Sequence, residues 1–420
     1  MRRVIETLVG FAVLTGVVVG ITTLTPAELP RATTVEAIRS TKVVCVPAAA
    51  DATVMVDSAT TVTPLGGAVT QTNRAVLTGQ GASVVAEGTD DPMGSTIAGT
   101  DGVRTLTQCV KPASRGVIAL PATADTQLKI VNPDASEAAI DLTLYGAEGE
   151  IQSLGARGIT LAAYEERVIA LSVLTKKATP VGVSFQASRG RGAVMAITQT
   201  QSSGTAAGPS QLGTSHLLPG IPAGATSSVV VLANPGETRI TANLTAYGTT
   251  PAYHPQGGEN ISVPPHASVS VSLENALLGE ASAIQVNSDA PVMAGMAFTL
   301  GDSAQVAPVA AGTSLGAFTP AGGTVQLTNP GEGDVQATVT ATGADGAEEK
   351  ATVTVEAGKT AVHKLPTSTE QGQRIVVNSD QALFGAVVSS GDTGSWAAPL
   401  ESMTGGETPP LAAELDPGLH

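Results

Sequence analysis

Aromatic and basic side chains are scarce in this 420-residue chain. It contains one Trp, four Tyr and five Phe, and its 21 Lys and Arg are outnumbered by 36 Asp and Glu, which gives a net charge of -15. No basic run follows Arg3, whereas binding to nucleic-acid phosphates requires clustered Lys and Arg. We therefore expect no nucleic-acid partner and interpret the negative charge as a solvated acidic surface.

Metal-ligand residues are also few. None of the five histidines lies between residues 1 and 215, and no two of them have the spacing of metal ligands. We place them in a linker, a Pro-rich loop, a turn, a partly buried strand position and the last position of the chain. In that order they are His216, His254, His266, His363 and His420. The sequence predicts no metal site and no cofactor.

The first thirty residues carry a targeting signal. Arg2 and Arg3 precede eighteen uncharged residues, Thr7–Leu24, and Pro26 ends the segment. That length spans a bilayer as a helix, and the flanking positive charges place the N-terminus inside. The alternative is a secretory signal peptide, and both alternatives export everything that follows. The apolar run is longer than is usual for a signal peptide and lacks a clear cleavage site, which favours an uncleaved anchor at residues 1–26.

Localisation follows from this anchor. We expect a single-pass protein of the cell membrane with its C-terminal part outside, connected to the anchor by a linker at residues 27–41. Cleavage would instead release a secreted protein. Two cysteines in an exported chain most simply oxidise together, so we predict a Cys45–Cys109 disulfide, with free thiols as the alternative. A disulfide that closes a loop of this length would stabilise the folded state by roughly 4 kcal/mol.

One pattern occurs three times: a hydrophobic strand, an Asn-Pro turn and a second strand that ends at Gly. The copies read LKIVNPDASEAAIDLTLYG, VVLANPGETRITANLTAYG and VQLTNPGEGDVQATVTATG, with the Asn at 132, 234 and 329. The period of about a hundred residues matches a whole domain and is too long for a solenoid turn. Apolar and polar residues alternate after each turn, which is typical of a strand with one buried face.

Further strands repeat in register, as in ITLAAYEERVIAL, ISVPPHASVSVSL and VTVEAGKTAVHKL. Each copy offers six or seven short strands with turns every eight to twelve residues, the pattern of an immunoglobulin-like sandwich. We expect an all-β chain: a disulfide-closed unit at 42–113, repeats at 114–208, 209–312 and 313–402, and a disordered tail at 403–420.

The Asn-Pro turns, the strands ending in Tyr-Gly and the motif NSDAPV resemble immunoglobulin-like repeats of bacterial surface proteins. With the anchor and the cysteine unit, residues 1–400 resemble an actinobacterial family of exported proteins of unknown function. The resemblance implies tandem sandwiches behind a membrane anchor and carries no activity. The NSD motif is missing from the first copy, where Ser188, Arg189 and Gly190 stand, so we assign it no binding role.

Candidate catalytic residues are weak. GTSLG, residues 312–316, matches the nucleophile elbow G-x-S-x-G, but that elbow needs a following helix and a converging His and acid. We interpret the segment as an interdomain connection, because repeat 2 has LGTSHLLPG at the same place. Ser314 is therefore not expected to be a nucleophile. The acidic pairs Asp90–Asp91 and Glu348–Glu349 are expected to be loop charges without calcium-loop spacing.

Two main functions stay open. The chain is either a non-catalytic scaffold that holds an envelope protein or a binder of envelope polysaccharide, with a hydrolase as a distant third. Sugars are usually gripped by exposed aromatic rings, of which this chain has few. We expect Tyr145 and Tyr247 to cap sandwich cores, and Trp396, which could anchor a partner, to cover the end of the last sandwich.

Overall fold

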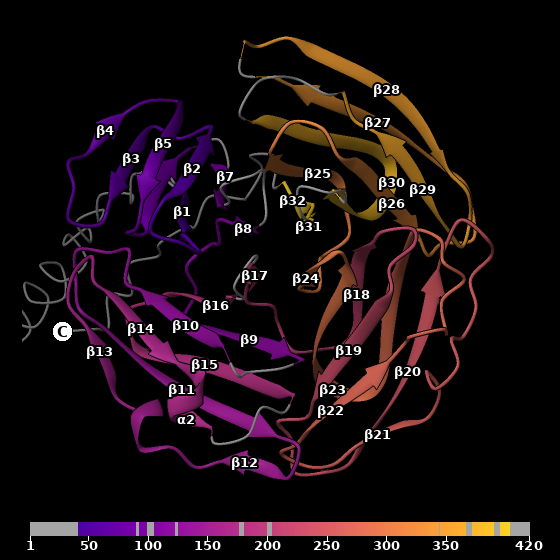
Figure 1. The fold of residues 1–420 in the computed structure, drawn as a ribbon, viewed down its shortest axis with the longest axis horizontal. Coiled ribbons are helices and arrows are strands. Elements are labelled where there is room, and N and C mark those ends of the chain that lie inside the picture. The colour runs from indigo at the N-terminus through magenta and orange to yellow at the C-terminus, as the bar shows by residue number, and fades with distance from the viewer. Residues whose placement is uncertain are drawn as a thin grey trace, which may run out of the picture. The chain divides into compact units, whose positions relative to one another are not determined.

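The computed structural model describes residues 41–89, 92–98, 105–121, 125–175, 180–199, 204–343, 345–366, 372–389 and 395–403. These residues form antiparallel sheets (Figure 1). Helix is confined, within them, to one turn, α2 (Leu171–Leu174), and one 3-10 turn, η1 (Leu154–Ala156). The described part of the chain is therefore nearly all β, as predicted.

The ends of the chain carry predictions that this structure does not test. The expected helix at residues 1–26, nearly all of the linker at 27–41 and nearly all of the tail at 403–420 lie outside the described residues. Among the residues that are described, no helix has the length and apolar character needed to cross a membrane.

The N-terminal unit consists of two four-stranded sheets, with strand orders β1-β6-β3-β4 and β5-β2-β7-β8. The predicted disulfide is present and joins the end of β1 to the residue after β8, between buried valines of both sheets. The strands are β1 (Thr41–Cys45), β2 (Ala52–Asp57), β3 (Thr61–Pro64), β4 (Thr70–Gln71), β5 (Arg74–Gln80), β6 (Val84–Gly88), β7 (Met93–Ala98) and β8 (Thr105–Gln108).

Repeat 1 also has two sheets, β14-β10-β16-β17 and β12-β11-β15-β9, with β13 paired to β11. Its core lies among β9, β10, β11, β15 and β16 and includes the fully buried Phe185. The strands are β9 (Arg115–Leu120), β10 (Thr126–Val131), β11 (Ala138–Gly146), β12 (Gly149–Ile151), β13 (Ile159–Leu161), β14 (Glu166–Ala170), β15 (Val181–Arg189), β16 (Ala193–Gln199) and β17 (Gly204–Ala207).

Repeats 2 and 3 keep this pairing pattern, except that one long strand in each takes part in both sheets. Repeat 2 contains β18 (Gly213–Ile221), β19 (Ser227–Ala233), β20 (Ile240–Tyr247), β21 (Ile261–Val263), β22 (Ser268–Ser272), β23 (Ser282–Leu300) and β24 (Asp302–Val306). Repeat 3 contains β25 (Gly312–Thr319), β26 (Thr324–Asn329), β27 (Val335–Thr342), β28 (Glu348–Val355), β29 (Lys359–Lys364), β30 (Gln373–Ser389), β31 (Trp396–Pro399) and β32 (Glu401–Ser402).

The predicted alternation holds in the second strand of each repeat. In β11 the buried residues Ile140, Leu142 and Leu144 alternate with half-exposed Asp141 and Thr143. β20 and β27 show the same period of two. Such a strand buries one face in the core and leaves the other wet, which fixes its register, because a one-residue slip would expose every apolar side chain.

The prediction of short strands throughout is wrong for β23 and β30. Each is a single strand of 19 or 17 residues that continues through the NSD motif from one sheet into the other. Asp289 accepts a hydrogen bond from the Thr241 N–H at 2.9 Å, and Asp380 accepts one from Gln336 N–H at 3.2 Å. In repeat 1, Gly190 adopts a φ of 67° and divides the equivalent segment into β15 and β16.

The repeated Asn before Pro is a buried hydrogen-bonding centre. Asn132, Asn234 and Asn329 are at most 2% exposed. The side-chain amide of each donates to the backbone oxygen four residues later, at 2.7 Å in all three repeats, and to at least one backbone oxygen near the end of a later strand. Its Oδ1 accepts from the N–H two residues later.

This Asn therefore joins three parts of a repeat: the strand that precedes it, the turn that follows it and the later strand. The later turn is also shared, because Tyr164, His266 and Gly358 occupy one equivalent position and have φ of 56°, 54° and 69°. Buried carbonyls need hydrogen-bond donors, and the two N–H groups of this amide serve two or three such carbonyls without a strand ladder.

We predict that Asn234→Ala destabilises repeat 2 by roughly 2–5 kcal/mol, because it leaves several buried carbonyls without a donor. The exposed Asn287 serves as a matched control, and Asn287→Ala should change stability by less than about 0.5 kcal/mol. Chemical denaturation of both variants measures the difference. Equal midpoints for Asn234→Ala and the control would contradict the role given to the buried Asn.

Candidate functional site

Ser314 does not occupy the interdomain connection that was predicted. It lies on β25, pairs in register with Asn378 of β30, and is followed by the buried core residues Leu315, Ala317 and Phe318. Within the described residues, no hydrogen bond joins Ser314 to a histidine or a carboxylate, and its backbone oxygen accepts from the N–H of Met403 at 2.9 Å. The strand forms because its apolar residues face the core of repeat 3, so the elbow-like string is part of a sheet.

The histidines are dispersed. His216 was predicted in a linker, but it lies on β18 and is only 8% exposed, with Nε2 3.0 Å from Gly213 O and 2.8 Å from Val292 O. These two carbonyls flank an irregularity in the register of β18, which explains why a side chain is needed there. His254 bonds Leu244 O, His266 lies in its predicted turn beside Glu237, and His363 is half-buried on β29. His420 lies outside the described residues.

The acidic pairs form no site either. Glu348 and Glu349 were predicted in a loop, but they begin strand β28, at the edge of its sheet (Figure 1). Charged residues at an edge strand discourage pairing with other chains. Asp90 and Asp91 lie outside the described residues. Across the part of the chain that the structure describes, no group of three or more His, Cys, Asp and Glu could hold a metal ion.

The three aromatic residues singled out from the sequence are buried, whereas Tyr164 is 45% exposed. Tyr145 and Tyr247 are 7% and 8% exposed, and Trp396 is 4% exposed on β31 within the core of repeat 3. Tyr145 packs with Val231 and Met293 of repeat 2, so it contributes to a junction between repeats as well as to its own domain. Burial raises the pKa of both tyrosines.

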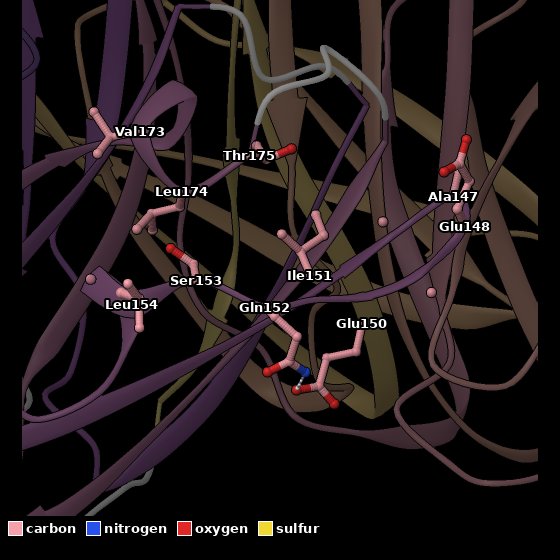
Figure 2. A pocket seen from close by; sticks show the side chains of 13 residues that line it. Ala147, Glu148, Glu150, Ile151, Gln152, Ser153, Leu154, Val173, Leu174 and Thr175 are labelled. Carbon is pink, nitrogen blue, oxygen red and sulfur yellow. Dashed lines mark hydrogen bonds between the residues drawn. The ribbon is translucent and has the colours of Figure 1, made fainter.

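A cavity in repeat 1 has a volume of about 770 Å³ and is lined by β12, η1 and α2 (Figure 2). Its polar lining includes Glu150, which accepts a hydrogen bond from Gln152 at 2.9 Å, and Ser153. Its apolar lining includes Leu154 and Val173, both highly exposed. Hydroxyl, amide and carboxylate groups beside apolar surface offer binding contacts, and no histidine or lysine lies among these lining residues.

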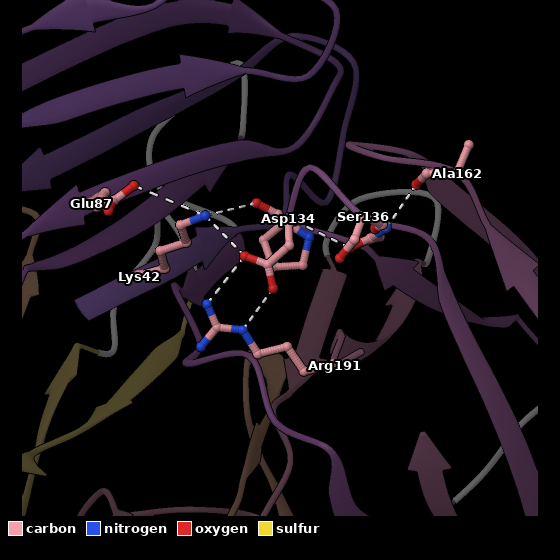
Figure 3. A network of polar contacts seen from close by, with 8 residues as sticks. Lys42, Glu87, Asp134, Ser136, Ala162 and Arg191 are labelled. Carbon is pink, nitrogen blue, oxygen red and sulfur yellow. Dashed lines mark hydrogen bonds and ion pairs between the residues drawn. The ribbon is translucent and has the colours of Figure 1, made fainter. Parts of the chain in front are cut away.

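A charged network connects the N-terminal unit to repeat 1 (Figure 3). The carboxylate of Asp134 accepts hydrogen bonds from Lys42 Nζ at 2.9 Å and from Arg191 Nε at 2.8 Å. Lys42 Nζ also lies 3.9 Å from Glu87 Oε2. The Arg191 hydrogen bond, helped by Lys42 and opposed by burial, lowers the pKa of Asp134 to about 2. The same hydrogen bond raises the pKa of Arg191. Repeats 2 and 3 have Gly236 and Gly331 at this position, so the network belongs to repeat 1.

A second contact recurs at every junction between consecutive modules. Glu166, Ser268 and Thr360 are equivalent, because each follows its left-handed turn residue by two positions. Glu166 accepts from Ser83 N–H of the N-terminal unit at 3.1 Å, Ser268 Oγ donates to Tyr145 O of repeat 1, and Thr360 Oγ1 donates to Tyr247 O of repeat 2 at 2.7 Å. The sequence alignment already held this signal: the position is polar in all three copies.

Apolar side chains complete these junctions. Buried clusters join the N-terminal unit to repeat 1, repeat 1 to repeat 2, and repeat 2 to repeat 3. At Gly295 a Cβ atom would lie 2.2 Å from the backbone oxygen of Ala119 in repeat 1, so this close approach requires glycine. The candidate functional surfaces of the described chain are thus its module junctions and the cavity of repeat 1.

The fold defines a tandem-repeat β protein with a disulfide-closed N-terminal unit. Residues 95–366 match the family of unknown function DUF5719, and because this is more than half of the chain, the chain belongs to that family. No match was found among curated proteins. A solved "tetra-tandem repeat in extending region of large adhesion protein" is similar over 87% of this chain and 100% of that chain, at 13% identity and a TM-score of 0.11. A TM-score this low carries no argument.

We predict that Asp134→Asn loosens the joint between the N-terminal unit and repeat 1 by at most about 2 kcal/mol at neutral pH. The folded-state pKa of Asp134 lies below the unfolded value near 3.9, so its stabilisation is present above about pH 4 and is lost as the pH falls toward 2. Calorimetric unfolding of both proteins across this window should show the difference vanish. Glu137→Gln, at the exposed pair with Arg189, is the control and should have little effect; a pH-independent difference for Asp134→Asn would contradict the assignment.

Proposed function

We propose that the chain is a non-catalytic scaffold or protein-interaction module of a bacterial cell envelope, tethered outside the membrane by its N-terminal segment. Three immunoglobulin-like sandwiches and the disulfide-closed unit make up its exported part. The actinobacterial setting belongs to this proposal and rests on the sequence resemblance. An oxidised cysteine pair supports export, since disulfides persist in oxidising compartments.

The observation that carries the proposal is where the recurring polar side chains are used. The three buried Asn residues hold the turns of their own repeats together, and Glu166, Ser268 and Thr360 bind the preceding module. An enzyme built from repeats would place at least one group of polar side chains in a cleft, with nucleophile, base and orienting group within hydrogen-bonding distance of one another. Here the recurring polar groups build one continuous framework, which is what a scaffold requires.

Polysaccharide binding is the second candidate, and the cavity of repeat 1 favours it. Glu150, Gln152 and Ser153 present carboxylate, amide and hydroxyl groups there beside the apolar Leu154 (Figure 2). Sugar hydroxyls bind such groups. The lining includes no aromatic residue, so a stacking platform for a sugar ring is missing from this cavity.

The two candidates predict opposite results for binding of the full-length chain to isolated cell envelopes. A protein-interaction scaffold should lose its binding when the envelopes are first digested with protease and keep it after periodate oxidation of the glycans. A polysaccharide binder should show the reverse. Gln152→Ala, in the cavity of repeat 1, serves as a matched variant that should reduce binding only in the second case. Retained binding after protease digestion would overturn the scaffold proposal.

We also predict that esterase, peptidase and glycosidase substrates are not turned over, and that Ser314→Ala changes nothing in these screens. The reason is geometric, because Ser314 lies on a strand and no histidine or carboxylate of the described residues is hydrogen-bonded to it, whereas an activated serine needs a base. Turnover that disappears in Ser314→Ala but persists in Ser379→Ala, a serine of the facing strand β30, would contradict this prediction.

A further inference from the structure

The four modules of the described chain make four junctions, and the fourth joins modules that are far apart in sequence. Repeat 3 contacts the N-terminal unit through Arg374, whose Nη1 lies 3.0 Å from Asp57 Oδ2, 317 residues away. Arg74 of the N-terminal unit donates to the backbone oxygens of Gly343 at 2.7 Å and Gly372 at 3.2 Å. The contacts of the modules therefore close into a cycle.

The closing junction uses a position of the repeat that the junction between repeats 1 and 2 also uses. The pairings Leu144–Val183 and Ala341–Ile375 make Gly182 and Arg374 equivalent. Gly182 N–H donates to Ser268 Oγ of the following module at 3.0 Å, and Arg374 donates to Asp57 of the N-terminal unit.

The strand end of each repeat is likewise an acceptor. Tyr145 O accepts from Ser268, Tyr247 O from Thr360 and Gly343 O from Arg74. The N-terminal unit thus occupies, at the end of repeat 3, the place that a following repeat occupies at the ends of repeats 1 and 2.

The closing junction differs from the others in its covalent connection. Consecutive modules share buried apolar clusters, and Leu106 and Ile97 of the N-terminal unit likewise pack against the core of repeat 3. The closing junction also contains an ion pair, Asp57–Arg374, and a guanidinium, Arg74, 5.1 Å from the centre of the Phe318 ring. No adjacent stretch of chain links its two sides. Ion pairs and cation–π contacts of partly exposed residues are weaker and more sensitive to salt than a buried apolar cluster.

We propose that this closing surface is a docking site for the N-terminal unit of a second copy of the chain. A head-to-tail surface closes within one chain or continues into the next. The surface of repeat 3 around Arg374 is complementary in charge to the surface around Asp57, whether Asp57 belongs to the same copy or to another. Two opened chains then exchange their closing contacts and form a reciprocal dimer, in which Asp57 of each copy meets Arg374 of the other. The proposal deepens the scaffold function by naming a second copy of the chain as its partner. It rests on the scaffold proposal for its biological role, whereas the assembly itself is measured without any envelope component.

The test uses charge reversal in the full-length chain. Asp57→Arg alone and Arg374→Asp alone each place like charges at the closing junction and block closure within the chain. Mixed together, the two variants offer one native and one reversed ion pair, both complementary, but only between two copies. The double variant Asp57→Arg/Arg374→Asp restores the pair within one chain and is the matched control.

We expect light scattering after size exclusion to give the monomer mass for each single variant and for the double variant, and twice that mass for the mixture. A mixture that stays at the monomer mass would overturn the proposal. If a single variant fails to fold by circular dichroism, two wild-type populations with different C-terminal tags replace it. Mixed at about 1 M salt, which screens ion pairs beyond roughly 3 Å, and returned to low salt, they should be captured together through both tags. Absence of doubly tagged dimers would overturn the proposal equally, and neither result bears on binding to envelope proteins.

Discussion

The hydrogen bonds of one buried asparagine amide underlie each repeat. A two-sheet module must turn the chain between its sheets, and each such turn leaves carbonyls that no strand ladder can satisfy. Asn132, Asn234 and Asn329 satisfy them from a single side chain that reaches both the adjacent turn and a distant strand end. The following Pro cannot donate a backbone hydrogen bond, so the strand ends there. From this point the Asn side-chain amide, and no longer the strand ladder, supplies hydrogen bonds to the backbone carbonyls.

The consequences extend from the turn to the junction. The strand that begins just beyond the later turn carries Glu166, Ser268 or Thr360 at its start, and this residue contacts the preceding module. The amide therefore orients the residues that join one repeat to the next. The N-terminal unit lacks this asparagine and has a small valine-rich core; small cores rarely stabilise a domain alone, and its disulfide compensates by restricting the unfolded chain.

Sequence reasoning could predict what depends on local pattern. The alternation of apolar and polar residues predicted that Ile140 and Leu142 lie in a core. The expectation of an oxidising compartment predicted the Cys45–Cys109 disulfide. Both predictions follow from residues read along the chain. It failed where a side chain acts across the fold. His216 looked like a linker residue because its partners, Gly213 O and Val292 O, meet only after β18 pairs with β23. The length of β23 was not predicted, because Asp289 in its middle bonds a backbone group 48 residues earlier, across the fold.

The same limit explains why the closing junction was invisible in the sequence. Repeats 1 and 2 have Gly182 and Ala283 where repeat 3 has Arg374. A single difference at one aligned position looks like a neutral substitution. It acquires meaning only beside Asp57, 317 residues away. A terminal repeat normally needs a polar face because no further repeat covers it. In this chain the polar face of the last repeat is instead matched to charges on the first module, so the residue that makes repeat 3 look atypical also completes the series of junctions.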